Sequence, residues 1–306
     1  MYWHNKRYYP LNEALQSHFG HKVQKLSLDG NFTCPNRDGK IGVQGCLFCS
    51  EKGSGEFAGD AMLSLHAQIA QQKQLLAKKW PAGKYIAYFQ NFTNTYASCD
   101  VLYQKYSEVL EDRDIVGLAI ATRPDCLEND VLEVLDYFNQ KTYLWVELGL
   151  QTIHANTAKL IRRGYPLATY EKAVQNLRKR NINVITHLIV GLPRETQAQM
   201  LDSVRYIAHT DTQGIKLHLL HILKNTDLYR FYTEHPFALL TQDQYIAYIV
   251  DAITLLPPDM VIHRLTGDGA RDLLVAPRWS LNKRAVLNGI DKELQKRDVF
   301  QGNKYP

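Results

Sequence analysis

The sequence predicts an α/β fold, an open, partial (β/α)6 barrel with a C-terminal helical extension. Six short runs rich in β-branched and aromatic residues alternate with longer amphipathic helical patterns, and no long low-complexity linker separates them. Such alternation indicates one parallel sheet with right-handed crossovers. Six units are too few for a closed eight-stranded barrel, so we expect a wide mouth at the carboxyl ends of the strands, where ligands of such sheets bind.

The elements follow one another in a regular order. The predicted strands are 22–29, 84–91, 114–122, 143–151, 183–191 and 214–222. The predicted helices, in which apolar residues recur every three or four positions, are 61–80, 101–112, 129–140, 167–180 and 196–209. Asp100, Asn129 and Thr196 are expected as N-cap or first-turn residues. After about residue 225 the pattern changes, so we predict a barrel with an N-terminal lead-in over 1–225 and an extension packed on it over 226–306.

Composition narrows the class of protein. The 306 residues are 45% hydrophobic and 22% charged, which is ordinary for a globular domain. No apolar run reaches the 18 residues of a membrane span, so no membrane partner is expected. Five cysteines, three of them bunched, do not resemble a disulfide framework, and they predict a reducing, cytoplasmic setting. A net charge of +5 permits a polyanionic partner without requiring one.

Three cysteines, Cys34, Cys46 and Cys49, lie in a Gly-rich loop directly after the first predicted strand, and hence at the barrel mouth. Three thiolates could hold a zinc ion with His66 or water as the fourth ligand. They could equally hold three irons of a [4Fe–4S] cluster and leave the fourth iron open to a small molecule with an amine and a carboxylate. The loop has no second C-x2-C pair to close a structural zinc site, which favours the cluster.

The loop "CPNRDGKIGVQGCLFC" resembles the radical S-adenosylmethionine (SAM) superfamily, in the branch related to the elongator catalytic subunit. In that branch the first cysteine spacing is longer than the usual C-x3-C-x2-C. The segments "LDGNFTCPNRDG", "ATRPDCL", "VELGLQT", "GLPRET", "IKLHLLHILKNTDL" and "HRLTGD" are similar to the bacterial YhcC/YtqA (MnmL) family. The resemblance implies one [4Fe–4S] cluster on the three cysteines, with SAM bound to its open iron.

Polar residues near the strand ends are candidates for SAM contacts. Glu147 and Gln151 share one face of the fourth strand by alternation, and the resemblance implies that they bind ribose hydroxyls and the SAM amine. A satisfied buried polar pair is the alternative. Gly191 starts a turn that forms the adenine pocket in related proteins. At the end of the third strand, Thr122 is a further candidate, and Arg123 could bind the SAM carboxylate, a substrate phosphate or a structural acidic partner.

The second and sixth strands supply further candidates. Many superfamily members carry Gly-Gly-Glu on the second strand, whereas this chain has "YFQNFTNTYA", so neutral groups of Gln90, Asn91 and Thr93 would hold the SAM amine. Lys216 and His218 share a face of the sixth strand, and His218 could contact adenine, act as an acid or base, or be a core histidine.

No catalytic residue is assigned firmly from the sequence. His218 is one candidate, and Cys126, as a hydrogen-atom donor, is another. Buried free thiols are common, so Cys126 could also be structural.

The resemblance implies an enzyme that acts on the wobble uridine of tRNA, converting 5-carboxymethylaminomethyl(-2-thio)uridine to 5-aminomethyl(-2-thio)uridine. Its partners would be tRNA, an electron donor such as flavodoxin or ferredoxin, and a downstream methyltransferase. The barrel rim and basic C-terminal extension would grip the RNA, with the base extruded into the pocket. One alternative is a radical SAM enzyme of the same family with a different substrate. A more distant one is a zinc-binding, non-enzymatic α/β protein.

Overall fold

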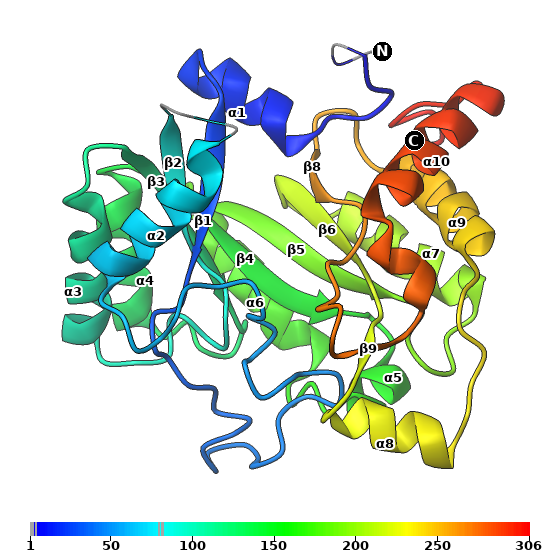
Figure 1. The fold of residues 1–306 in the computed structure, drawn as a ribbon, viewed down its shortest axis with the longest axis horizontal. Coiled ribbons are helices and arrows are strands. Elements are labelled where there is room, and N and C mark those ends of the chain that lie inside the picture. The colour runs from blue at the N-terminus through cyan, green and yellow to red at the C-terminus, as the bar shows by residue number, and fades with distance from the viewer. Residues whose placement is uncertain (1–2, 4, 79, 81–82) are drawn as a thin grey trace.

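The computed structural model describes residues 3, 5–78, 80 and 83–306, and Figure 1 shows their fold. The strands are β1 (Val23–Leu28), β2 (Lys84–Phe89), β3 (Ile115–Thr122), β4 (Tyr143–Gln151), β5 (Asn183–Val190), β6 (Gly214–Leu219), β7 (Ile222–Leu223), β8 (Val261–Arg264) and β9 (Leu274–Ala276). The helices are α1 (Leu11–Phe19), α2 (Leu65–Ala77), α3 (Cys99–Leu110), α4 (Asn129–Asn139), α5 (Ala155–Leu160), α6 (Leu167–Arg178), α7 (Gln197–Ala208), α8 (Asp227–Glu234), α9 (Gln242–Leu255) and α10 (Lys283–Lys296). A short 3₁₀ turn spans Arg278–Leu281.

The main sheet has seven strands in the order β1-β2-β3-β4-β5-β6-β8, and every neighbouring pair is parallel. Each of the first six strands begins and ends within its predicted range. The prediction of a partial parallel barrel is therefore confirmed. The sheet nevertheless has one strand more than predicted, because β8 adds a seventh beside β6. Its four residues are too short a run to stand out in the sequence, and they come from the stretch predicted as a helical extension.

Alternation along the strands separates two environments. On β4, Leu144, Val146 and Leu148 belong to the large core between the sheet and its helices. Trp145 instead belongs to a smaller cluster on the opposite, inner face. Leu15 of α1 packs into that inner cluster, so α1 covers the amino-terminal end of the strands. The loop after β1 lies at the other end of the sheet, near α8, as Figure 1 shows.

The helix predictions also hold, with shifted ends. Thr196 caps α7 with a complete capping box, Asp100 lies in the first turn of α3, and Asn129 begins α4. The helix predicted over 61–80 is α2, which ends at Ala77; position 79 lies outside the described residues. Within the described residues, no helix is long and apolar enough to cross a membrane.

Residues after 225 contribute both helices and strands. Helices α9 and α10 pack against each other, and α9 also contacts α7 of the barrel. Strand β9 pairs with β7 in a separate two-stranded antiparallel sheet. The C-terminal part thus packs on the barrel and also extends its sheet, and a domain boundary at residue 225 stays a prediction.

Candidate functional site

A cavity of about 400 Å³ lies at the carboxyl ends of the parallel strands. Its walls come from the loop after β1, from the strand ends β1 to β6, and from the segment that follows β8. All three cysteines of the loop, Cys34, Cys46 and Cys49, line it. The predicted position of the site at the barrel mouth is thus where the structure has its cavity.

Backbone hydrogen bonds and Arg37 shape the cysteine loop. The chain turns at Cys34, whose carbonyl oxygen accepts from the Arg37 N–H at 2.8 Å, and again at Cys46, whose carbonyl accepts from the Cys49 N–H at 3.0 Å. Gly45 has a φ of +73°, and a Cβ there would lie 2.9 Å from Arg37 Nε. Arg37 also donates to the Cys49 carbonyl at 3.1 Å. The glycine therefore lets Arg37 hold the two halves of the loop together.

Two polar groups donate to the cysteine sulfurs. Asn36 Nδ2 lies 3.6 Å from Cys46 Sγ, and Ser54 Oγ lies 3.8 Å from Cys49 Sγ. Burial, with a smaller contribution from Cys49, raises the pKa of Cys46 to about 12. Thiolates in this place need a cation to compensate their charge, and hydrogen bonds to sulfur are a means of tuning an iron–sulfur cluster. The donor set fits a cluster.

Zinc and an iron–sulfur cluster make different demands on three thiolates. A zinc ion needs its sulfurs about 2.3 Å from one point, whereas a cluster binds each thiolate through a separate iron. In the part of the chain that the structure describes, no three His, Cys, Asp or Glu side chains converge on one ion. His66, the suggested fourth zinc ligand, instead contacts Glu108 at 3.3 Å and Glu111 at 3.1 Å. The fourth zinc ligand considered from the sequence is thus already bound to carboxylates at the end of α3.

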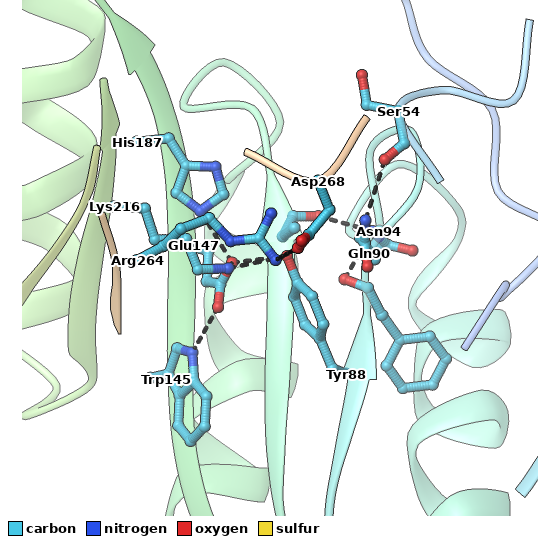
Figure 2. A network of polar contacts seen from close by, with 12 residues as sticks. Ser54, Tyr88, Gln90, Asn94, Trp145, Glu147, His187, Lys216, Arg264 and Asp268 are labelled. Carbon is cyan, nitrogen blue, oxygen red and sulfur yellow. Dashed lines mark hydrogen bonds and ion pairs between the residues drawn. The ribbon is translucent and has the colours of Figure 1, made fainter. Parts of the chain in front are cut away.

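A buried carboxylate lies at the centre of the barrel, beneath the cavity (Figure 2). Glu147 Oε1 accepts from Trp145 Nε1 at 2.9 Å. Its Oε2 accepts from the Tyr88 hydroxyl and from His187 Nε2, each at 2.8 Å, and forms an ion pair with Lys216. Both oxygens therefore have protein partners, and Glu147 joins strands β2, β4, β5 and β6.

The charge states in this network follow from burial and from the neighbours. Burial alone would raise the pKa of Glu147, but Lys216, His187 and Lys25 together hold it well below its usual value, so the carboxylate is ionised. Burial, reinforced by Lys216, lowers the pKa of His187 to about 4. His187 is therefore neutral at pH 7 and, because Glu147 can only accept, carries its proton on Nε2.

Most of the residues predicted to bind SAM share the cavity with the cysteines. Those lining it are Gln90, Thr93, Thr122, Arg123, Glu147, Gln151 and His218. Gln90 Nε2 donates to the Ser54 carbonyl at 3.0 Å, and the Thr122 hydroxyl lies 2.6 Å from that of Thr95. Arg123 is 8% exposed and forms two hydrogen bonds with Asp125, at 2.9 and 2.7 Å. The sequence analysis considered the SAM carboxylate, a substrate phosphate and a structural acidic residue as partners of Arg123. The structure contains the last of these, Asp125.

Four other candidates lie outside the cavity lining. Asn91 donates to Asp29, and Lys216 is covered by Glu147 and Tyr88. The Gly191 N–H donates to Met200 Sδ at 3.1 Å. Cys126 is buried, with its sulfur 3.9 Å from Asp125 Oδ1. Direct contact of these four with a ligand in the cavity would require a local rearrangement, and their roles stay predictions.

The sequence analysis did not single out several residues of the site. Tyr88 and His187 line the cavity, and alternation from Gln90 would have found Tyr88. The Tyr165 ring centre lies 4.9 Å from the guanidinium carbons of both Arg123 and Arg163. Arg264 and Asp268 also line the cavity. Both fall in the quoted segment "HRLTGD", but their placement depends on β8, which was not predicted.

Comparison with known proteins agrees with this geometry. The family model described as "Radical SAM superfamily" matches residues 37–207, and the one described as "Radical_SAM C-terminal domain" matches 212–296. The protein YtqA of Bacillus subtilis is 49% identical over 297 residues, which are 97% of this chain and 92% of YtqA. Protein YhcC of Escherichia coli is 38% identical over 288 residues, which are 93% of this chain and 91% of YhcC.

More distant similarity reaches proteins with a named RNA substrate. A tRNA uridine(34) acetyltransferase of Methanocaldococcus infernus is 27% identical over 169 residues, which are 54% of this chain and 31% of that protein. The solved structure of the Methanocaldococcus infernus Elp3 with an N-terminal deletion has a TM-score of 0.68 at 17% identity, over 91% of this chain and 64% of that one. The chain belongs to the radical SAM superfamily, in its elongator-like branch and the YhcC/YtqA family.

Proposed function

We propose that this radical SAM enzyme modifies the wobble uridine of tRNA and converts 5-carboxymethylaminomethyl(-2-thio)uridine to 5-aminomethyl(-2-thio)uridine. The observation that carries the proposal is the shared cavity, in which three cysteines and the polar ends of the barrel strands surround one space of about 400 Å³. Removal of a carboxymethyl group from an amine is hard for acid–base catalysis, because no adjacent group activates the bond. Radical chemistry suits this step.

The choice of tRNA rests on relatives and on charge. The acetyltransferase named above acts, by its name, on tRNA uridine 34, and its matching segment covers about half of this chain. The net charge of +5 suits a polyanionic substrate. Binding to RNA should weaken as salt increases, since neutralised phosphates release counterions. A uridine extruded from its loop would enter the cavity at the carboxyl ends of the strands.

Cys34, Cys46 and Cys49 would hold a [4Fe–4S] cluster, with SAM as the cosubstrate. When bound, the cluster supplies the electron for reductive cleavage of SAM. The protein's own part is to bind, orient and exclude water. Gln90, Thr93 and Gln151 line the cavity and offer amides and a hydroxyl to the SAM polar groups. Apolar rings, among them Phe48 and Phe92, line the same cavity and limit water there.

Glu147 has a positioning role in this proposal. Its carboxylate faces the cavity, yet four protein donors already hold it, so it orients the floor of the site through Tyr88 and His187. Thr122 would add a hydroxyl to the cavity wall. Gly191, Asn91 and Lys216 would act through the turns and strands next to the cavity.

The proposal also includes a cytoplasmic setting, a flavodoxin or ferredoxin as electron donor, and a methyltransferase that uses the product.

The first experiment tests the cofactor. After anaerobic reconstitution with iron and sulfide, the wild-type protein should hold about four irons and form 5′-deoxyadenosine from SAM under reducing conditions. Cys46→Ser should lose both properties. Cys99→Ser is the matched control, because Cys99 is a half-buried free cysteine that does not line the cavity. One tightly held zinc in place of iron, with no cleavage of SAM, would contradict the proposal.

A second experiment tests the substrate. The reconstituted enzyme is incubated with SAM, a reductant and tRNA that carries 5-carboxymethylaminomethyluridine, and the nucleosides are identified by mass spectrometry. The expected product is 5-aminomethyluridine, absent with Cys46→Ser. Cleavage of SAM with the modified uridine left intact would indicate a different substrate within the same family.

A further inference from the structure

Arg264 brings a positive charge into the cavity from the edge strand that the sequence did not predict. The sheet has two edges, β1, which leads into the cysteine loop, and β8, which ends at Arg264. Residues from both edges line the same cavity. In Figure 2 the Arg264 guanidinium points across the site toward Asp268, in front of Glu147 and Tyr88. The barrel thus offers a cation on a strand different from the one that leads to the cysteines.

The guanidinium is oriented but still accessible. Arg264 Nη2 lies 3.2 Å from Asp268 Oδ2, and its side chain is 27% exposed. Lys283 Nζ contacts the two oxygens of Asp268 at 2.6 and 2.9 Å, which fixes the carboxylate. A guanidinium has five N–H donors in a planar fork. Within the described residues Arg264 contacts Asp268 through Nη2, so other N–H groups of the guanidinium remain for a ligand.

The groups around Arg264 do not cancel its charge. Glu147 is paired with Lys216, and Asp268 is shared between Arg264 and Lys283. These three ion pairs join three basic side chains to two carboxylates, which leaves one positive charge unmatched on this side of the cavity. Burial lowers the pKa of His221 to about 4 and that of His218 well below its usual value, so both rings are neutral. The Nε2 atoms of the two rings are buried and have no hydrogen-bond partner among the described residues.

We propose that Arg264, oriented by Asp268, binds the carboxylate of the substrate's 5-carboxymethylaminomethyl group. The inference rests on the proposed function and names the residue that selects the substrate. A planar fork binds a carboxylate through two parallel hydrogen bonds, which gives direction as well as charge. An RNA phosphate offers the same oxyanion chemistry. The base and its substituent enter the cavity, however, while the backbone stays at the mouth, so the carboxylate is the group that reaches Arg264.

The test compares two RNAs and three proteins. Anticodon stem-loops that carry either 5-carboxymethylaminomethyluridine or plain uridine at the wobble position are bound to wild type, Arg264→Gln and Arg205→Gln at one salt concentration. Arg205 forms an ion pair with Asp202 at 2.8 Å on the exposed face of α7. Arg205→Gln therefore removes one positive charge, as Arg264→Gln does, but outside the cavity lining. We expect wild type and Arg205→Gln to bind the modified stem-loop at least about tenfold more tightly, and Arg264→Gln to lose that preference.

Each other outcome has a definite meaning. Equal weakening of both RNAs by Arg264→Gln would assign the residue to a backbone phosphate and overturn the inference, as would an unchanged preference. Iron content and the far-ultraviolet circular dichroism spectrum, measured alongside, should equal those of wild type and show that Arg264→Gln is folded. If wild type neither prefers nor converts the modified uridine, the proposed function fails. If wild type converts it and Arg264→Gln does so with the same KM, the inference alone fails.

Discussion

At the residue scale, the buried ion pair of Glu147 and Lys216 has the most demanding environment in the described site. Both side chains are at most 1% exposed. A buried charge is costly to remove from water, and its partner must compensate it closely. Tyr88, Trp145 and His187 supply the remaining hydrogen bonds to the carboxylate. The network holds four strands in register beneath the cavity, so its loss should affect both stability and the shape of the site.

Burial holds the pKa of Lys216 well below its usual value, and the charge of Glu147 opposes that effect, so Glu147→Gln leaves a Lys216 ammonium without its counter-charge. We expect the free energy of unfolding to fall by about 3–5 kcal/mol, which is the usual effect of breaking one partner of a buried pair. Anaerobic unfolding in urea measures the change. The double variant Glu147→Gln with Lys216→Met serves as the control, because it removes both charges and should recover much of the loss. A single variant as stable as wild type would show that Lys216 is neutral in the folded protein.

At the element scale, the cysteine loop is supported by helices that follow later in the chain. Leu47 lies between Cys46 and Cys49, its N–H donates to the Ile161 carbonyl at 3.0 Å, and its own carbonyl accepts from the Leu228 N–H at 2.8 Å. Leu47, Ile161 and Leu228 share a buried apolar cluster. The end of α5 and the start of α8 therefore position the cysteine loop, and α8 belongs to the part of the chain after residue 225.

Leu228→Ala should loosen the cluster loop more than the barrel. Leu228 is 1% exposed, and a large-to-small change at such a position costs about 2–5 kcal/mol locally. We expect iron to be lost to a chelator several-fold faster than from wild type under anaerobic conditions, while the far-ultraviolet circular dichroism is unchanged. Leu75→Ala, at a leucine that is 70% exposed on α2, is the matched control and should behave as wild type. Equal rates of iron loss would contradict the role given to α8.

The elements also show what the sequence could and could not predict. The six strands were predictable because each is a short β-branched or aromatic run between helical patterns. The three cysteines after the first strand pointed to the end of the sheet at which the cavity lies. The partners of Glu147 could not be predicted, because they depend on the register across β2, β4, β5 and β6. The position of Arg264 in the cavity could not be predicted for a related reason, since β8 is a strand because it pairs with β6.

At the scale of the whole molecule, the two ends of the barrel differ in what lies over them. At the amino-terminal end Leu15 of α1 belongs to the same buried apolar cluster as Trp145 and Ile185. At the carboxyl end the two edge strands, β1 and β8, both lead into residues that line the cavity. Because the sheet does not close, a large substrate such as a nucleic acid can approach the cavity between the two edges. The buried polar groups beneath the cavity come from most strands of the sheet, and they should make stability depend on pH.

Four half-buried histidines contribute to that dependence. Burial is the largest cause that lowers the pKa of each one: to about 4 for His187 and His221, and well below the usual value for His218 and His263. In the unfolded chain each would titrate near 6.5. Between about pH 4 and 6.5 the unfolded state therefore binds more protons than the folded state, and stability must fall as the pH falls. The lowered pKa of Glu147 acts in the same direction, but only below about pH 4.5, where an unfolded glutamate takes up a proton.

We therefore expect the free energy of unfolding to decrease from pH 7 to pH 5, with a slope that approaches about 1.4 kcal/mol per pH unit for each histidine that is protonated only on unfolding. Urea unfolding at a series of pH values measures the slope. His263→Gln should reduce it by up to one such increment, because His263 is a half-buried ring packed on Trp145, and burial holds its pKa well below the usual value. His235→Gln, at an exposed position, should leave the slope unchanged. A slope that is the same in wild type and His263→Gln would mean that His263 is already protonated in the folded protein or exposed to solvent.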